Sequence, residues 1–203
     1  MFVAGVALCL CGNVAAQGRF DAGAWLGANM AQIDGDGAGS YNHIGIAAGI
    51  ESSFALGDID SPLRAMVGIG FAQKGSYVAD INRRINLSYV EIPVMLTLNF
   101  MDSRLRVGAG VAPAVLVNSV VTDDGIANDL QSNNFRRMDA LPLCTSLRYL
   151  IGGNWGLEIR YQNSMLPITK ESGSGTYRIV RSNQGAFNRL ICIAIAYRWQ
   201  PSR

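Results

Sequence analysis

The sequence predicts an all-β fold, specifically an eight-stranded antiparallel up-and-down transmembrane β-barrel. Three observations lead to this prediction: apolar residues recur at every second position, the connections alternate between long and short, and charged side chains share one face of the alternation. A period of two is typical of strands, because successive side chains point to opposite faces. The predicted strands are residues 20–30, 43–54, 63–74, 87–100, 104–117, 138–151, 155–164 and 188–199.

The composition allows one domain and restricts its environment. The chain has 203 residues, and 16% of them are charged, against roughly 25% in soluble domains. Beyond residue 20 no apolar run approaches the roughly 18 residues that a transmembrane helix needs. A net charge of +2 is too small to indicate a nucleic-acid partner. A soluble β-sandwich and a membrane β-barrel both fit this composition.

The lengths of the strands and of their connections favour the barrel. Strands of this length exceed the usual 5–6 residues of soluble proteins and suit a tilted membrane strand of roughly 9–11 residues plus its ends. Outer-membrane barrels have short periplasmic turns and long outer loops, whereas a sandwich has no reason to sort its loops in this way. The predicted long connections are residues 31–42, 75–86, 118–137 and 165–187, and the short ones are 55–62, 101–103 and 152–154. This order leaves both termini in the periplasm.

Charged residues alternate with the predicted lipid-facing positions. On the lipid face a charge costs about 2–4 kcal/mol near the midplane, so these side chains are expected to point inward. An eight-stranded barrel is just wide enough to be filled by its side chains. We therefore predict a filled interior held by a polar network, with glycines leaving room for the long side chains. The predicted inward charges are Asp21, Glu51, Arg64, Lys74, Glu91, Arg148, Glu158, Arg160 and Arg198. Glu91 is expected to pair with Lys74 or Arg160, and Pro93 to lie at a bulge or an irregular pairing.

The N-terminal segment resembles a cleaved secretion signal. Residues 2–11 form an apolar or small-residue run, and Val14, Ala15 and Ala16 offer a small-residue cleavage site. We expect a signal peptide at 1–16 and a barrel domain at 17–203, although no Lys or Arg precedes the apolar run. The alternative is a buried first strand.

Two cysteines remain in the expected mature chain, Cys144 and Cys192, on the sixth and eighth predicted strands. Strands two apart are separated by roughly 9–10 Å, beyond the roughly 7 Å limit between the Cα atoms of a disulfide. We therefore expect two free, packed cysteines.

Two aromatic residues near the C-terminus, Tyr197 and Trp199, alternate at the end of the last predicted strand. Aromatic side chains favour the membrane interface. This pair resembles the C-terminal signal that the barrel-assembly machinery reads during insertion, although four residues follow it. The alternative is an edge strand of a soluble sheet.

Several segments together resemble the PorT-like outer-membrane β-barrel family, which is common in Bacteroidetes. The resemblance covers essentially the whole mature chain, and its motifs are structural signatures. They are GANMAQIDGD at 27–36, FAQKGS at 71–76, LSYVEIPVML at 87–96, GAGVAP at 108–113 and LEIRY at 157–161. The resemblance implies a bacterial outer-membrane location in contact with outer-membrane lipid. Because the founding member looks like a type IX secretion factor, it also raises an accessory role in a secretion or assembly complex.

Our main functional hypothesis is a monomeric structural or interaction barrel that binds a protein partner or a surface glycan through its outer loops. The rival is a narrow porin-like channel, and a lipid-modifying enzyme is a more distant alternative. We expect no enzyme, because the only histidine, His43, lies at a loop edge with Ser40 as its nearest candidate nucleophile. No cofactor or metal is expected, since Asp34 and Asp36 lack the later ligands of a calcium loop. Four arginines make the last two long loops basic: Arg136, Arg137, Arg178 and Arg181.

Overall fold

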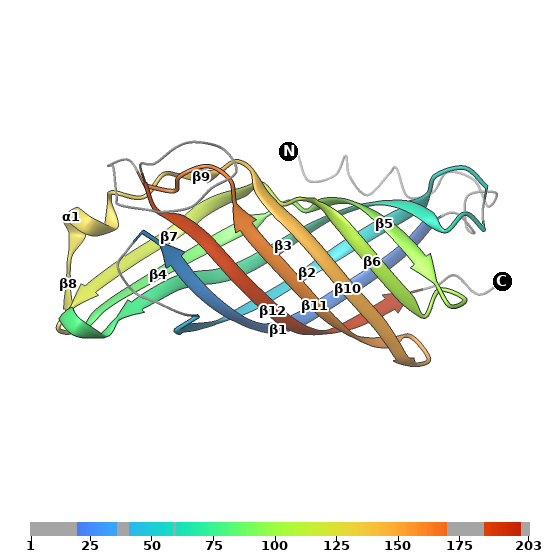
Figure 1. Cartoon of the computed structure of the whole chain (residues 1–203), viewed down its shortest axis with the longest axis horizontal. Helices are drawn as coiled ribbons and strands as arrows, with labels where there is room; N and C mark the ends of the chain where they lie inside the picture. Colours follow the sequence, from blue (N-terminus) through green and yellow to red (C-terminus); the bar gives the residue numbers. More distant parts are fainter. Residues whose placement is uncertain (1–19, 36–40, 59, 170–184, 200–203) are drawn as a thin grey trace, which may run out of the picture.

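A computed structural model describes residues 20–35, 41–58, 60–169 and 185–199. Within these residues twelve antiparallel strands form a single closed sheet, and one short helix and one 3-10 helix lie in its connections (Figure 1). The strands are β1 (Phe20–Asp34), β2 (His43–Ala55), β3 (Leu63–Val78), β4 (Arg83–Glu91), β5 (Val94–Phe100), β6 (Leu105–Val111), β7 (Ala114–Asp123), β8 (Ile126–Ala127), β9 (Met138–Asp139), β10 (Pro142–Gly152), β11 (Trp155–Ser164) and β12 (Phe187–Trp199). The helix is α1 (Asp129–Ser132) and the 3-10 helix is η3 (Ala79–Ile81).

Pairing between the first and last strands closes the sheet. β1 and β12 stay in register from Ala22 opposite Trp199 to Asp34 opposite Phe187. The twelve strands make eight spans, because β4 continues as β5, β6 continues as β7, and β9 continues as β10, while the two-residue β8 pairs only with the end of β7 and is not a span. The predicted eight-stranded up-and-down barrel is therefore confirmed. Closure removes exposed sheet edges, which a lipid bilayer does not tolerate.

The two ends of the barrel differ. β1 begins and β12 ends at the end that carries the short connections, which we call the terminal end; the opposite end is the loop end. Residues 75–78, 83–86 and 118–123 were predicted to be loop but are strand, and they project from the loop end. Polar side chains had suggested loops there, yet the backbones pair in register from Gly75 opposite Asn86 to Val78 opposite Arg83. We call these three strand segments the loop-end extension.

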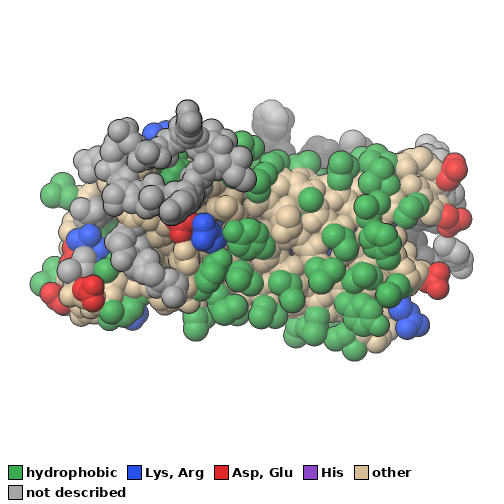
Figure 2. Space-filling view, viewed as in Figure 1, with side chains coloured by type: hydrophobic (Ala, Val, Ile, Leu, Met, Phe, Trp, Pro, Cys, Tyr) green, Lys and Arg blue, Asp and Glu red, His purple; other side chains and the backbone are tan. Residues whose placement is uncertain are grey.

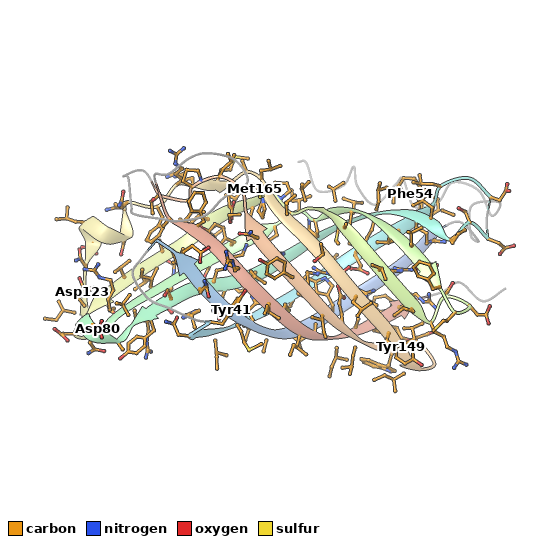
Figure 3. All side chains as sticks on the ribbon, in the orientation of Figure 1. Tyr41, Phe54, Asp80, Asp123, Tyr149 and Met165 are labelled. Carbon is orange, nitrogen blue, oxygen red and sulfur yellow. The ribbon has the colours of Figure 1, made fainter. Side chains whose placement is uncertain are left out.

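Side-chain and backbone groups of neighbouring segments seal both edges of the loop-end extension. On the β3 edge, the Asn42 amide donates to the Tyr77 carbonyl at 2.5 Å and accepts from the Tyr77 N–H at 3.0 Å. On the β7 edge, the Val121 N–H donates to the Ser132 hydroxyl at 3.0 Å, and the Asn128 N–H donates to the Val121 carbonyl at 2.8 Å. Asp80 and Asp123 lie at the far end of this extension, and Phe54 and Tyr149 lie at the opposite end of the barrel (Figure 3).

The outer wall of the barrel is apolar. Leu26, Ile46 and Ile195 are exposed on it, and green apolar side chains cover the visible wall in Figure 2 while most charges lie toward its ends. A ring of exposed aromatic side chains marks the terminal end: Phe20, Phe54, Phe100, Tyr149, Trp155 and Trp199. Such a girdle is typical of the membrane interface. No helix among the described residues is long and apolar enough to cross a membrane.

The two cysteines of the described residues lie inside the barrel. Cys144 on β10 and Cys192 on β12 are buried and free, which confirms the prediction. β11 separates their strands, with Gln162 opposite Cys144 and Arg160 opposite Cys192.

Three prolines interrupt three neighbouring spans. The breaks fall at Ile92–Pro93 between β4 and β5, at Ala112–Pro113 between β6 and β7, and before Pro142 between β9 and β10. Pro93 produces an irregular pairing and no bulge, because the register with β3 is the same on both sides of the break.

Two inward glycines make room for the indole of Trp25. A Cβ atom on Gly49 would lie 2.8 Å from Trp25 Cζ2 and 2.8 Å from the Ile69 carbonyl oxygen, and one on Gly70 would lie 3.0 Å from Trp25 Cζ2. The wall around Trp25 therefore tolerates no added side chain without movement.

Gly49→Ala is expected to destabilise the barrel by about 1–3 kcal/mol, because overpacking a filled interior forces side chains and backbone to shift. Thermal unfolding in detergent, followed by circular dichroism, measures the change. Gly152→Ala is the matched control, since a Cβ there meets nothing within 4 Å. Equal melting temperatures for the two variants would contradict the packing account.

Candidate functional site

The barrel interior holds the charged residues that alternation assigned to it. All eight residues of the predicted interior polar network are buried, and so is Asp21. They are Glu51, Arg64, Lys74, Glu91, Arg148, Glu158, Arg160 and Arg198. They come from six spans, and seven of them, together with Asp21 and Arg106, form three ion-pair clusters along the barrel.

The central cluster joins Glu51, Arg148, Glu158 and Arg160. Arg148 Nη1 lies 2.6 Å from Glu51 Oε1, and its Nε and Nη2 donate to Glu158 Oε2. Arg160 Nη2 lies 2.7 Å from Glu158 Oε1 and 3.6 Å from Glu51 Oε2. The Arg160 guanidinium also stacks 4.2 Å from the ring centroid of Trp25. Two carboxylates and two guanidiniums thus neutralise one another, as burial of charge requires.

A second cluster pairs Lys74 with Glu91. Lys74 Nζ lies 2.7 Å from Glu91 Oε1, and each side chain is only 1% exposed. Gln162 bridges the pair, accepting from Lys74 Nζ at 3.1 Å and donating to Glu91 Oε2 at 2.9 Å. The ammonium also lies 5.1 Å from the centroid of the Tyr89 ring. Glu91 thus contacts Lys74, one of its two expected partners, while Arg160 belongs to the central cluster.

The third cluster lies toward the terminal end. Asp21 Oδ2 accepts ion pairs from Arg64 at 3.3 Å and from Arg106 at 3.1 Å. Arg106 Nε also donates to Asn99 at 2.9 Å. Closer to the turns, Arg198 donates to the carbonyl of Ser103 at 3.3 Å.

The loop end of the interior is closed by polar and apolar groups. Asp139 accepts hydrogen bonds from Ser164 and Asn188. Beyond them lies a buried apolar cluster drawn from several strands and from residues of both long loops: Ile33, Ile85, Leu87, Tyr89, Ala114, Val121, Phe135, Ile168 and Ala186. Side-chain clusters thus fill the barrel from one end to the other.

Five interior residues were missed by the sequence reasoning. Arg106 alternates with the outward Leu105 and Val107, so strict use of the period would have found it. Trp25 was overlooked because an aromatic residue carries no charge signal. Asp139 follows the outward Met138 but lies beside the break in its span. Gln162 and Asn188 are neutral partners whose roles appear only once the strands are paired.

The structure describes only some of the other candidate residues. His43 is half-buried at the start of β2, and Ser40 lies outside the described residues. Asp34 pairs with Arg189 at 2.7 Å, and Asp36 also lies outside the described residues. Among the residues that the structure describes, no cluster of His, Cys, Asp or Glu could hold a metal ion.

The loop end exposes charge. Arg136 and Arg137 are exposed, and within the described ranges neither forms an ion pair with a carboxylate. Arg178 and Arg181 lie outside those ranges. Arg83 binds Asp123 with both ends of its guanidinium, at 2.6 and 3.2 Å, so these hydrogen bonds lower the pKa of Asp123 and raise the pKa of Arg83.

The two C-terminal aromatic residues contact each other on the wall at the terminal end. The ring centroids of Tyr197 and Trp199 lie 5.0 Å apart in an edge-to-face arrangement, and Trp155 lies 4.8 Å from Tyr197. Edge-to-face packing of this kind is favourable. The residues beyond Trp199 lie outside the described part of the chain.

Comparison with known proteins places this architecture among outer-membrane β-barrels. The family model described as outer membrane protein beta-barrel domain matches residues 15–170. The crystal structure of Ail, the attachment invasion locus protein of Yersinia pestis, in complex with the heparin analogue sucrose octasulfate has a TM-score of 0.53 and 8% identity, covering 89% of this chain and 99% of that one. Ail without that ligand has a TM-score of 0.52 and 9% identity, again covering 89% and 99%. Neisserial surface protein A has a TM-score of 0.48 and 12% identity, covering 90% and 97%. No curated protein sequence matches the chain.

Glu91→Gln is expected to destabilise the protein by about 3–5 kcal/mol, because it leaves the buried Lys74 ammonium without its counter-charge. Urea unfolding in detergent measures the change. Adding Lys74→Met to this variant removes the stranded charge and is expected to recover much of the loss. A double variant less stable than Glu91→Gln alone would contradict this account.

Proposed function

This chain belongs to the outer membrane protein beta-barrel domain family, and from that premise we propose that it is a filled interaction barrel that acts at the cell surface through its loop end. It is an outer-membrane β-barrel protein; the proposal concerns what the barrel does there. The observation that carries the proposal is the interior, which ion pairs and apolar side chains occupy along its length.

A filled interior argues against the rival function of a narrow channel. An ion passing through would have to separate pairs such as Arg148 with Glu158 and Lys74 with Glu91, and then displace the apolar cluster around Phe135. Breaking one buried pair costs about 3–5 kcal/mol. A protein that conducts by diffusion would keep such charges apart along a water-filled path.

The orientation in the membrane belongs to the same proposal. Short connections in these barrels face the periplasm and long ones face outward, so the loop end would lie outside the cell and both termini in the periplasm. This fits a secretion signal at 1–16 and assembly from Tyr197 and Trp199 by the barrel-assembly machinery. The resemblance to PorT-like barrels of Bacteroidetes supports membership of a secretion or assembly complex as one form of the interaction. We propose no enzymatic activity and a monomeric barrel surrounded by outer-membrane lipid.

The partner class that we favour is an anionic surface glycan. Ail, whose fold is similar, is described in complex with a sulfated heparin analogue. Arg136 and Arg137 are consecutive exposed arginines at the loop end, and Arg136 Nε donates to the Thr169 carbonyl at 2.9 Å. Guanidiniums bind sulfate and phosphate oxygens through paired hydrogen bonds. A protein partner remains the alternative outcome of the tests below.

Planar-bilayer recordings of the purified protein are expected to show no steady ionic steps, because the interior ion pairs leave no water-filled path. A large-pored outer-membrane porin inserted in the same way confirms that the bilayer reports conductance. Regular single-channel steps that disappear when the protein is omitted would favour the porin-like channel over the interaction barrel.

Binding of sucrose octasulfate to the detergent-solubilised protein is expected, and Arg136→Gln with Arg137→Gln is expected to weaken it about tenfold through loss of two exposed charge contacts. Calorimetric titration at low and high salt measures this, since screening should weaken the same contacts. Arg104→Gln, which replaces an exposed arginine at the terminal end, controls for the loss of positive charge from the protein surface. An equal loss of affinity in the loop-end and terminal-end variants would show that the loop end is not the binding surface. Co-purification of one stoichiometric protein would favour the assembly role.

A further inference from the structure

The three prolines in the wall weaken three consecutive strand interfaces at the same level. In an antiparallel ladder, two residues of a hydrogen-bonded pair exchange two N–H···O bonds. Here the Gly68 N–H donates to the Pro93 carbonyl, the Ile92 N–H to the Pro113 carbonyl, and the Ala112 N–H to the Pro142 carbonyl, each at 2.9 Å. The return bond is missing in every case because proline has no N–H.

These three half-bonded pairs lie in a line across the wall. The first joins β3 to the β4–β5 span, the second joins that span to β6–β7, and the third joins β6–β7 to β9–β10. We call them the proline seam. By contrast, β12 pairs with β1 without a break from Trp199 to Phe187. Since an unpaired carbonyl is costly in hydrocarbon, the seam is a weak part of the membrane-facing wall.

The seam lies within the membrane, in the half nearer the loop end. Ile92 precedes Phe100 of the aromatic ring by eight positions. At about 3.3 Å per residue and a tilt of about 40°, this places the seam roughly 20 Å from the terminal-end interface, inside an apolar band of about 25 Å. The outward side chains around it, Ile92, Val94, Leu141 and Leu143, are apolar and exposed. Lipid chains therefore meet the wall at this level.

A small apolar cluster lies directly behind the seam. Met66, Met95, Ala112 and Cys144 pack together and are buried. Their strands are those that the seam joins, and Cys144 follows Pro142 by two positions. A second buried apolar cluster, which includes Trp25, Leu190 and Cys192, lies behind the unbroken pairing of β12 with β1 and β11, so it is the broken ladder that distinguishes the wall at the seam. Methionine side chains are flexible and adapt readily to a new neighbour.

We propose that the proline seam opens laterally and admits a single lipid acyl chain from the outer half of the membrane onto the cluster of Met66, Met95, Ala112 and Cys144. The wall opens there because each strand interface has one hydrogen bond fewer to break. The occupant is an acyl chain because the path begins in hydrocarbon and ends on apolar side chains, with no charged group to desolvate between them. The two methionines move aside and contact the chain.

Two buried cysteines can report whether the wall opens at the seam, one as the probe and the other as its control. Cys144 and Cys192 are 1% and 2% exposed, so each is shielded to the same degree. Cys144 lies behind the seam, while Cys192 lies behind the unbroken pairing of β12 with its neighbours. With Cys9 and Cys11 replaced by alanine, the further changes Cys192→Ala and Cys144→Ala give two single-cysteine proteins that compare the two walls in one barrel.

The experiment measures thiol labelling of the folded protein in phospholipid vesicles by mass spectrometry. N-phenylmaleimide, which partitions into lipid, is expected to label Cys144 at least tenfold faster than Cys192. A charged, membrane-impermeant maleimide is expected to label neither. Lauric acid is expected to slow the labelling of Cys144 by occupying the cluster. Faster labelling of Cys144 by the charged reagent, or equal labelling of both cysteines by the lipid-soluble one, would overturn the proposal.

Restoring a donor to the seam is expected to close it. Pro113→Val returns an N–H opposite Ile92 and should slow Cys144 labelling about five- to tenfold, the effect of one net hydrogen bond; Pro142→Val does the same opposite Ala112. Pro62→Val adds a donor at the terminal end of β3 and should leave the rate unchanged. Migration on unheated gels and the Cys192 rate confirm that each variant is folded. If folded Pro113→Val and Pro142→Val both label at the original rate, the seam is not the route.

Discussion

Burial of charge without bulk water is the constraint on which the rest of this structure depends. The barrel is narrow, and five carboxylates and six cations lie inside it among the described residues: Asp21, Glu51, Glu91, Asp139 and Glu158, with Arg64, Lys74, Arg106, Arg148, Arg160 and Arg198. Each must find counter-charges or hydrogen bonds, because solvation by the bilayer is not available. The inward glycines, the stacked indole of Trp25 and the bridging amide of Gln162 all serve that pairing. The apolar side chains that alternate with these charged residues form the outer wall and face the lipid.

The alternation along each span revealed most of this from the sequence. Inward positions such as Glu51, Arg148 and Glu158 could be assigned because a charged side chain that faces lipid near the midplane is destabilising. For Glu91 the sequence left two partners open, because the choice depends on a register that pairs Lys74 with Leu87 and still lets the Lys74 ammonium reach Glu91 along the inner wall. Arg106 lies at an inward position of the same alternation, so the pattern predicts its burial, although it was not included among the predicted inward charges.

The ends of the spans were harder to predict for a physical reason. Inside the membrane, lipid enforces apolar alternation, but beyond it a strand needs only backbone partners. Residues 75–78 and 83–86 pair there with polar side chains, so their composition resembles a loop. The breaks at Pro113 and Pro142 were also missed, because strand periodicity passes through them unchanged. Only Pro93, inside the most distinctive motif, was expected to disturb the pairing.

The sealed edges of the loop-end extension have a consequence for crowding at the cell surface. A β-ribbon that projects from a membrane usually offers its bare edges to the same ribbon on a neighbouring molecule, which leads to zippering. Asn42 occupies one edge with its amide, and Ser132 and Asn128 occupy the other. Copies packed densely in one membrane can therefore stay separate particles, each presenting its tip independently.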